Sequence, residues 1–162
     1  MIQKACQQII IIFILIFISG CGQTKYLSVK NKLFEKYAVV SAHPLASEVG
    51  AKIFAKGVNI VDALIATHFA LAVVYPIAGN IGGGGFALIK FRDSIPISLD
   101  FREVAPSHAT KDMYQDAAGN IILGASTKGA LAVGVPGSVY GMWSLFERYS
   151  KLHDWKALIQ PS

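Results

Sequence analysis

Four consecutive glycines, residues 82–85, constrain what this chain can fold into more than any other feature of its sequence. Glycines lacking a Cβ let a backbone approach its surroundings closely, and their N–H groups can line an anion site. The run has no Gly-Lys-Ser/Thr ending, so it is not a P-loop. It also follows a predicted helix and precedes a predicted strand, the reverse of a dinucleotide fold. From these residues alone, a tight structural loop and a ligand site stay equally open.

The segments on either side of the glycine run predict an α+β fold. Asn59 is suited to cap a helix that ends before Pro76, and Asp62 is placed as its capping-box partner. That helix is apolar on both faces, which indicates burial between two layers. After the glycines, β-type runs at 86–91 and 97–101 predict a hairpin. A hairpin packed on helices is typical of the α+β class.

The rest of the chain from residue 38 predicts shorter or less regular elements. A helix is expected to begin at Pro44, with Ser41 or His43 near its cap, and to stop at Gly57. The remaining expectations are a β-type run at 38–41, an irregular or helical stretch at 105–116, a turn at 116–120, a short strand at 131–135 and a helix from 136 to 149.

The N-terminal segment predicts an exported lipoprotein. Lys4 precedes ten apolar residues at 9–18, and Ser19-Gly20-Cys21 follows, as in the lipobox of bacterial lipoproteins. The Cys21 thiol would take the lipid, and residues 1–20 would be removed as a signal peptide. We therefore expect a membrane-anchored protein on the periplasmic or cell-surface side. The competing interpretation is an uncleaved signal anchor with an incidental cysteine.

The positive charge of the chain is concentrated near its N-terminus. Residues 1–37 contain five lysines and one glutamate, whereas residues 38–162 contain ten basic and nine acidic residues. Residues 21–37 are therefore interpreted as a lysine-bearing tether, and residues 38–162 as the folded part. A near-neutral folded part gives no basic patch for nucleic acid.

Few side chains in the folded part form a recognisable catalytic pattern. The four histidines, His43, His68, His108 and His153, lack metal-ligand spacing, so no metal site and no cofactor are predicted. Ser138 does not lie in a Gly-x-Ser-x-Gly motif and is interpreted as helix polarity. Arg102 follows a predicted strand, where a guanidinium can hold a carboxylate through two hydrogen bonds. Its spacing alone favours a salt bridge to Asp100 or Glu103 instead.

Taken together, five segments resemble the N-terminal part of the gamma-glutamyltransferases, also called glutathione hydrolases. The resemblance covers essentially all of residues 38–160 and lies in the segments 40–47, 57–63, 80–86, 99–106 and 131–138. It implies the αββα sandwich of the N-terminal nucleophile hydrolases, of which this chain would form a part. It also implies a precursor that cleaves itself into a large and a small subunit.

The resemblance further implies a chemistry and one site residue. The new N-terminal threonine of the small subunit attacks the gamma-glutamyl amide of glutathione or a related compound, and its own amine acts as base. The glutamyl group then passes to water or to an amino acid. By this resemblance Arg102 binds the α-carboxylate of the substrate, which overturns the salt-bridge interpretation. The glycine run is interpreted as structural.

The chain also departs from the family's pattern. The family's nucleophile lies far downstream of Ser162, so no catalytic residue is expected here. Thr67-His68 echoes the sequence at that nucleophile, but Thr67 falls in the capped helix and the echo is interpreted as coincidence. The primary hypothesis is an inactive, membrane-tethered fragment that needs the missing small-subunit portion as partner. The alternative is a stand-alone, non-catalytic lipoprotein that binds a glutamate-like ligand.

Overall fold

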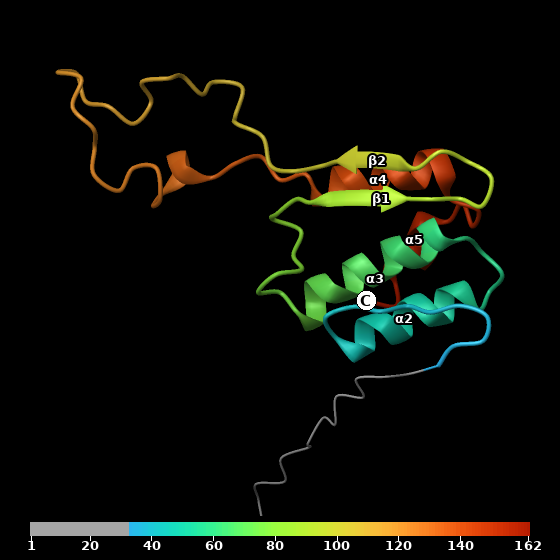
Figure 1. The fold of residues 1–162 in the computed structure, drawn as a ribbon. Helices are drawn as coiled ribbons and strands as arrows, with labels where there is room; N and C mark the ends of the chain where they lie inside the picture. Colours follow the sequence, from blue (N-terminus) through green and yellow to red (C-terminus); the bar gives the residue numbers. More distant parts are fainter. Residues whose placement is uncertain (1–32) are drawn as a thin grey trace, which may run out of the picture. The chain divides into compact units, whose positions relative to one another are not determined.

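A computed structural model describes residues 33–162, and residues 37–162 form one compact unit (Figure 1). Cys21 and the expected signal peptide lie outside the described residues, as does most of the tether. The described chain combines helices with a two-stranded sheet, which confirms the α+β class. In order, the elements are α2 (Pro44–Phe54), α3 (Ile60–Val74), β1 (Phe86–Ile89), β2 (Ile97–Asp100), the 3₁₀ helix η1 (Ala130–Ala132), α4 (Ser138–Tyr149) and α5 (Trp155–Ile159).

Helix α2 begins where proline and a polar cap predict it. His43 precedes Pro44 in extended backbone, and its side chain accepts a hydrogen bond from the Leu45 N–H at 3.3 Å. Proline at the first helical position loses no hydrogen bond, because that N–H has no partner within a helix. The helix ends at Phe54, and Gly57 then adopts a φ of 77°, a left-handed conformation that favours glycine.

Helix α3 begins with the predicted capping box and is buried on two sides. The Asn59 side chain accepts from the N–H groups of Val61 and Asp62, while the Asn59 N–H donates to the Asp62 carboxylate. In Figure 1 the helix lies between α2 and the layer that holds the hairpin and α4. Ile65 and Phe69 are buried in the core on the hairpin side. The prediction of a helix between two layers is confirmed.

The predicted hairpin is present and divides into an inner and an outer face. Strands β1 and β2 pair antiparallel, with Phe86 opposite Asp100 and Ile89 opposite Ile97. Ile89 is buried in the core, whereas Phe86 and Leu88 on the other face are 68% and 77% exposed. The hairpin therefore shields the core on one side and leaves an apolar outer face.

The hydrophobic core joins α3, the hairpin, α4 and α5. Aromatic rings at its edge contact one another edge to face: Trp155 packs against the buried Phe69 and the partly exposed Trp143 at centroid distances of 5.5 and 5.1 Å. Such pairs contribute beyond the burial of their area. The buried apolar members of this core are Ile53, Val61, Ile65, Ala66, Phe69, Ile89, Phe101, Met142, Leu145 and Leu158.

Three expectations from the sequence differ from the structure. Residues 38–41 are not a strand, because the described sheet has two strands only and offers them no partner. Residues 131–135 are not a strand either: they begin in η1 and reach a single bridge between Val104 and Val135. Helix α5 was not predicted, although Asp154 caps it by accepting from the Ala157 N–H.

The segment between β2 and α4 is irregular and runs out from the sheet before returning (Figure 1). We call residues 105–134 the arm. The predicted turn at 116–120 is present: the Asp116 carboxylate accepts hydrogen bonds from the Asn120 N–H, the Asn120 side chain and the Ala118 N–H, and these bonds lower its pKa. Several large apolar side chains of the arm are exposed, including Ile121 at 80% and Leu123 at 99%.

Candidate functional site

Arg102 lies two residues beyond the end of β2, at the rim of the sheet. Its backbone N–H donates to the Asp100 carboxylate at 2.9 Å, which fixes the turn of the chain after the strand. Its exposed guanidinium lies over the ring of Phe86 on β1, with the guanidinium carbon 5.9 Å from the ring centroid. At this distance an aromatic face attracts a cation, so Phe86 helps to orient the side chain.

The guanidinium of Arg102 remains available for a ligand. Within residues 33–162 the one salt bridge joins Lys52 to Glu48, so neither Asp100 nor Glu103 neutralises Arg102. An unpaired arginine at a sheet rim can hold a carboxylate through two parallel hydrogen bonds. Sequence reasoning identified the arginine, but not the contact with Phe86, which lies 16 residues earlier in the chain.

The glycine run connects the hairpin to α4. The Gly83 carbonyl accepts from the N–H groups of Gly137 and Ser138 at 2.9 and 3.0 Å. The Ser138 hydroxyl donates to the Asn80 carbonyl at 3.2 Å and the residue is 1% exposed. These contacts support the interpretation of the run as structural and of Ser138 as a packed helix residue.

The histidines of the described chain are not gathered into a metal site. Within residues 33–162, no three His, Cys, Asp or Glu side chains come close enough together to hold an ion. His68 on α3 contacts the rings of Phe69 and Phe101 edge to face. Its Nε2 atom is buried without a hydrogen-bond partner among the described residues, and burial lowers its pKa. His68 therefore behaves as a packed, neutral side chain.

Thr67 does not resemble an exposed nucleophile. It is 9% exposed, and its hydroxyl donates to the Ala63 carbonyl one turn earlier in α3 at 2.7 Å. The same hydroxyl lies against Gly50 of α2, where the two helices pack most closely. This position agrees with the interpretation that the Thr-His echo is coincidental.

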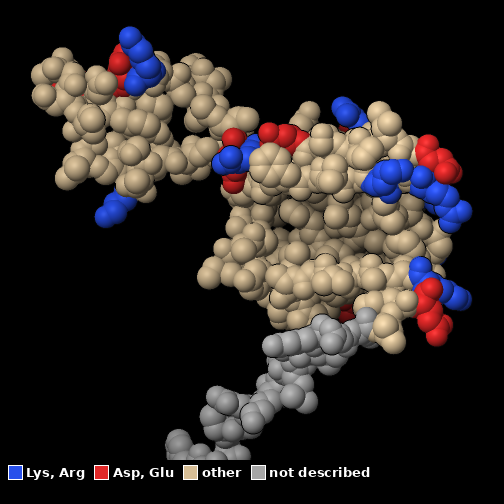
Figure 2. Space-filling view, viewed as in Figure 1, with Lys and Arg blue, Asp and Glu red and all other residues tan. Residues whose placement is uncertain are grey.

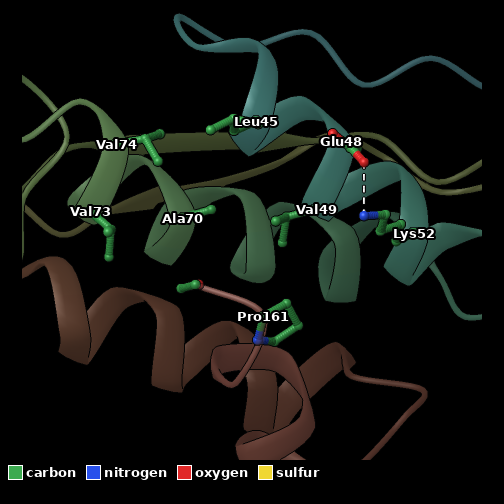
Figure 3. A pocket seen from close by; sticks show the side chains of 9 residues that line it. Leu45, Glu48, Val49, Lys52, Ala70, Val73, Val74 and Pro161 are labelled. Carbon is green, nitrogen blue, oxygen red and sulfur yellow. Dashed lines mark ion pairs between the residues drawn. The ribbon is translucent and has the colours of Figure 1, made fainter.

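Two shallow hollows lie on the described surface, and neither includes Arg102. One of about 280 Å³ lies between α2, α3 and the C-terminal residues (Figure 3), where Lys52 and Glu48 form their ion pair at 2.8 Å. The other, of about 350 Å³, is lined by residues of α3, the loop after it and the C-terminal residues. Arg102 thus lies apart from both of these hollows.

Charged side chains on the visible face do not form a single-sign patch. In Figure 2 the Lys and Arg side chains are spread over residues 33–162, and several lie beside Asp or Glu. No helix within residues 33–162 has the length and apolar character needed to cross a bilayer.

Comparison with known proteins identifies the family. The model of the gamma-glutamyltranspeptidase family matches residues 46–162. Glutathione hydrolase proenzymes of Pseudomonas sp. and Escherichia coli are 55% and 41% identical over 71% and 76% of this chain. The match covers 20% and 21% of their own lengths, so the chain spans about a fifth of these relatives.

Solved structures give the same result. The gamma-glutamyltranspeptidase of Helicobacter pylori aligns with a TM-score of 0.74 and 47% identity, over 81% of this chain and 37% of its own. That of Pseudomonas nitroreducens, complexed with L-DON, aligns with a TM-score of 0.71 and 46% identity, over 80% of this chain and 38% of its own. The helices and hairpin described above are therefore part of that fold, and the chain belongs to the gamma-glutamyltranspeptidase family.

Proposed function

We propose that this chain is the N-terminal part of the large subunit of a gamma-glutamyltransferase that acts on glutathione and related compounds. The observation that carries the proposal is Arg102, whose unpaired guanidinium lies at the sheet rim of a chain that belongs to this family. A gamma-glutamyl compound carries a free α-carboxylate, which is the planar anion that a guanidinium holds best.

In the proposed reaction, Arg102 binds and orients the substrate while a threonine of the remaining protein reacts with it. The threonine oxygen attacks the γ-carbonyl carbon, its proton passes to the threonine amine, and the amide nitrogen leaves with a proton. Water or the amine of an amino acid then takes the glutamyl group from the threonine ester. Arg102 touches the substrate carboxylate and not the bond that breaks, so its contribution is binding.

A completed proenzyme tests this function. The full chain is continued by the downstream part of the Pseudomonas sp. proenzyme, which is 55% identical over the matched segment. We expect this completed proenzyme to cleave itself into two subunits and to release p-nitroaniline from γ-glutamyl-p-nitroanilide. The 162-residue chain alone should release none, because it lacks the nucleophile. Release of p-nitroaniline by the chain alone would contradict the proposal.

We propose that the protein is exported and anchored to the membrane by a lipid on Cys21. The support is the order of Lys4, the apolar residues 9–18 and the small residues before Cys21. In bacteria fed a radiolabelled fatty acid, the chain should incorporate label, and Cys21→Ala should abolish it. Cys6→Ala is the matched control, because Cys6 precedes the apolar run and should not affect labelling. Label retained by Cys21→Ala would exclude the anchor.

The exposed apolar side chains favour an incomplete domain over a stand-alone binding protein. Phe86, Leu88 and Leu123 are each at least two-thirds exposed, and such surface is normally covered. We therefore expect residues 22–162 alone to aggregate or to unfold without cooperativity. A soluble, cooperatively unfolding product that binds glutamate would instead favour the non-catalytic lipoprotein.

A further inference from the structure

Three glycines from two segments, the glycine run and the start of α4, lie against Phe101 and the peptide that joins it to Arg102. We call Gly84, Gly137 and Gly141 the glycine cradle. A Cβ built on Gly84 would lie 2.5 Å from the Phe101 carbonyl oxygen and 2.7 Å from the Arg102 Cα. Both distances are shorter than 3.0 Å, and real Cβ atoms essentially never come so close to another atom.

The first turn of α4 closes on the same peptide from another segment. A Cβ on Gly137 would lie 2.7 Å from the Phe101 carbonyl carbon and 2.9 Å from the Arg102 carbonyl oxygen. One on Gly141 would lie 2.6 Å from the Phe101 Cβ. Unlike Gly57 and Gly119, these glycines have no positive φ, so what requires glycine here is close approach and not backbone conformation.

Hydrogen bonds hold the cradle closed around this peptide. The Phe101 N–H donates to the Gly85 carbonyl at 2.9 Å, which extends the pairing of the two strands. The Gly83 carbonyl accepts from the Gly137 N–H at 2.9 Å, which ties the start of α4 to the glycine run. The backbone of Phe101 and Arg102 is therefore packed between the glycine run and the start of α4, and these two segments are hydrogen-bonded to each other.

We propose that the glycine cradle consists of positioning residues that fix the direction in which Arg102 leaves the sheet toward the substrate carboxylate. The inference rests on the proposed function of Arg102. A methyl group on Gly137 meets main-chain atoms, which cannot rotate away as a flexible side chain would. Either α4 or the Phe101–Arg102 peptide must then move, and a shift of about 1 Å at a binding group can cost about a hundredfold in rate.

The test compares two substrates in the completed proenzyme. γ-Glutamyl-p-nitroanilide carries the free α-carboxylate, and its α-methyl ester does not. The ratio of their kcat/KM values measures how well Arg102 recognises the carboxylate, and a general loss of stability does not change it. We expect Arg102→Ala and Gly137→Ala each to lower this ratio about tenfold or more.

Gly50→Ala is the matched control. A Cβ there would meet the Thr67 hydroxyl and lie 2.9 Å from the Val39 Cγ1, so it is as crowded as the cradle but lies between α2 and α3. It should lower the unfolding temperature and leave the substrate ratio within about twofold. The inference would be overturned if Gly137→Ala kept the wild-type substrate ratio while Arg102→Ala lowered it. Retention by Arg102→Ala would instead refute the proposed function.

A milder variant keeps the test decisive where Gly137→Ala yields no mature enzyme. A Cβ on Gly85 would lie 3.2 Å from the far ring atoms of Phe101, so the neighbour must give by a few tenths of an ångström only. Gly85→Ala should mature and lower the substrate ratio, by less than Arg102→Ala does. Gly85 lies beside the cradle, so a ratio equal to that of Gly50→Ala would count against the positioning of Arg102 by the packing around Phe101.

Discussion

Replacing Asp62 by alanine is expected to destabilise the folded chain by about 3–4 kcal/mol. Asp62 is completely buried, and its carboxylate accepts four hydrogen bonds. One comes from the cap residue of its own helix, Asn59, at 3.4 Å. The other three come from the loop after α4: the Ser150 hydroxyl at 2.5 Å and the N–H groups of Lys151 and Leu152 at 3.0 and 3.3 Å.

Alanine would leave these donors without their acceptor. A buried donor left without an acceptor lowers the free energy of unfolding by about 1–3 kcal/mol. Ser150 is such a donor, since it is 5% exposed. Asn59 also donates from its side chain to the Tyr149 carbonyl at the end of α4, so Asp62 and Asn59 together tie the start of α3 to the end of α4. Asp62→Asn keeps the shape and one acceptor oxygen, so it should cost less than alanine.

Urea unfolding of the mature completed proenzyme, followed by circular dichroism, measures this effect. Asp93→Ala is the matched control, since Asp93 is an exposed residue of the hairpin turn. An unfolding midpoint for Asp62→Ala equal to that of Asp93→Ala would show that the buried carboxylate does not hold α3 to α4.

Arg102→Ala in the completed proenzyme is expected to raise KM about 10- to 150-fold with little change in kcat. The estimate follows from the loss of a charged hydrogen-bonding group, worth about 1.5–3 kcal/mol. KM changes alone because Arg102 is proposed to hold the substrate carboxylate equally in the ground state and the transition state. Arg102→Lys should lie between the wild type and alanine, since lysine keeps the charge and loses the two-pronged geometry.

Arg92 provides the control for this prediction. It is an exposed arginine in the turn at the opposite end of the same hairpin. Arg92→Ala removes the same charge without touching the rim that carries Arg102, so KM for γ-glutamyl-p-nitroanilide should not change. A KM for Arg102→Ala that matches that of Arg92→Ala would remove Arg102 from the substrate site.

Those parts of the fold that depend on neighbouring residues could be predicted from the sequence. Short segments of the sequence indicate the helix caps at His43 and Asn59, the end of the first helix before Gly57 and the hairpin at 86–101. The strand expected at 131–135 failed because β-type composition does not supply a partner, and only Val135 found one. Helix α5 is five residues long, too short to show a period of its own.

The candidate site could be predicted in part. Its place after a strand alone favours a salt bridge for Arg102, and only the resemblance to a family assigns it to the substrate, which stays a prediction. The residues that orient Arg102 could not be predicted, because folding brings Phe86, Gly84 and Gly137 to it. Asp62 was likewise identified as a capping residue, but its bond to Ser150 spans 88 residues of chain. Such contacts leave no local pattern in the sequence.

The base of the arm has a consequence for how this region tolerates change. Val104 and Val135 exchange two backbone hydrogen bonds, at 3.2 and 2.8 Å, so the entry and exit of the arm are held together. The closure entropy of a loop grows only slowly with its length, by about 0.6 kcal/mol for each doubling. Insertions and deletions within residues 105–134 are therefore expected to cost the fold little stability, while the hairpin and α4 keep their register.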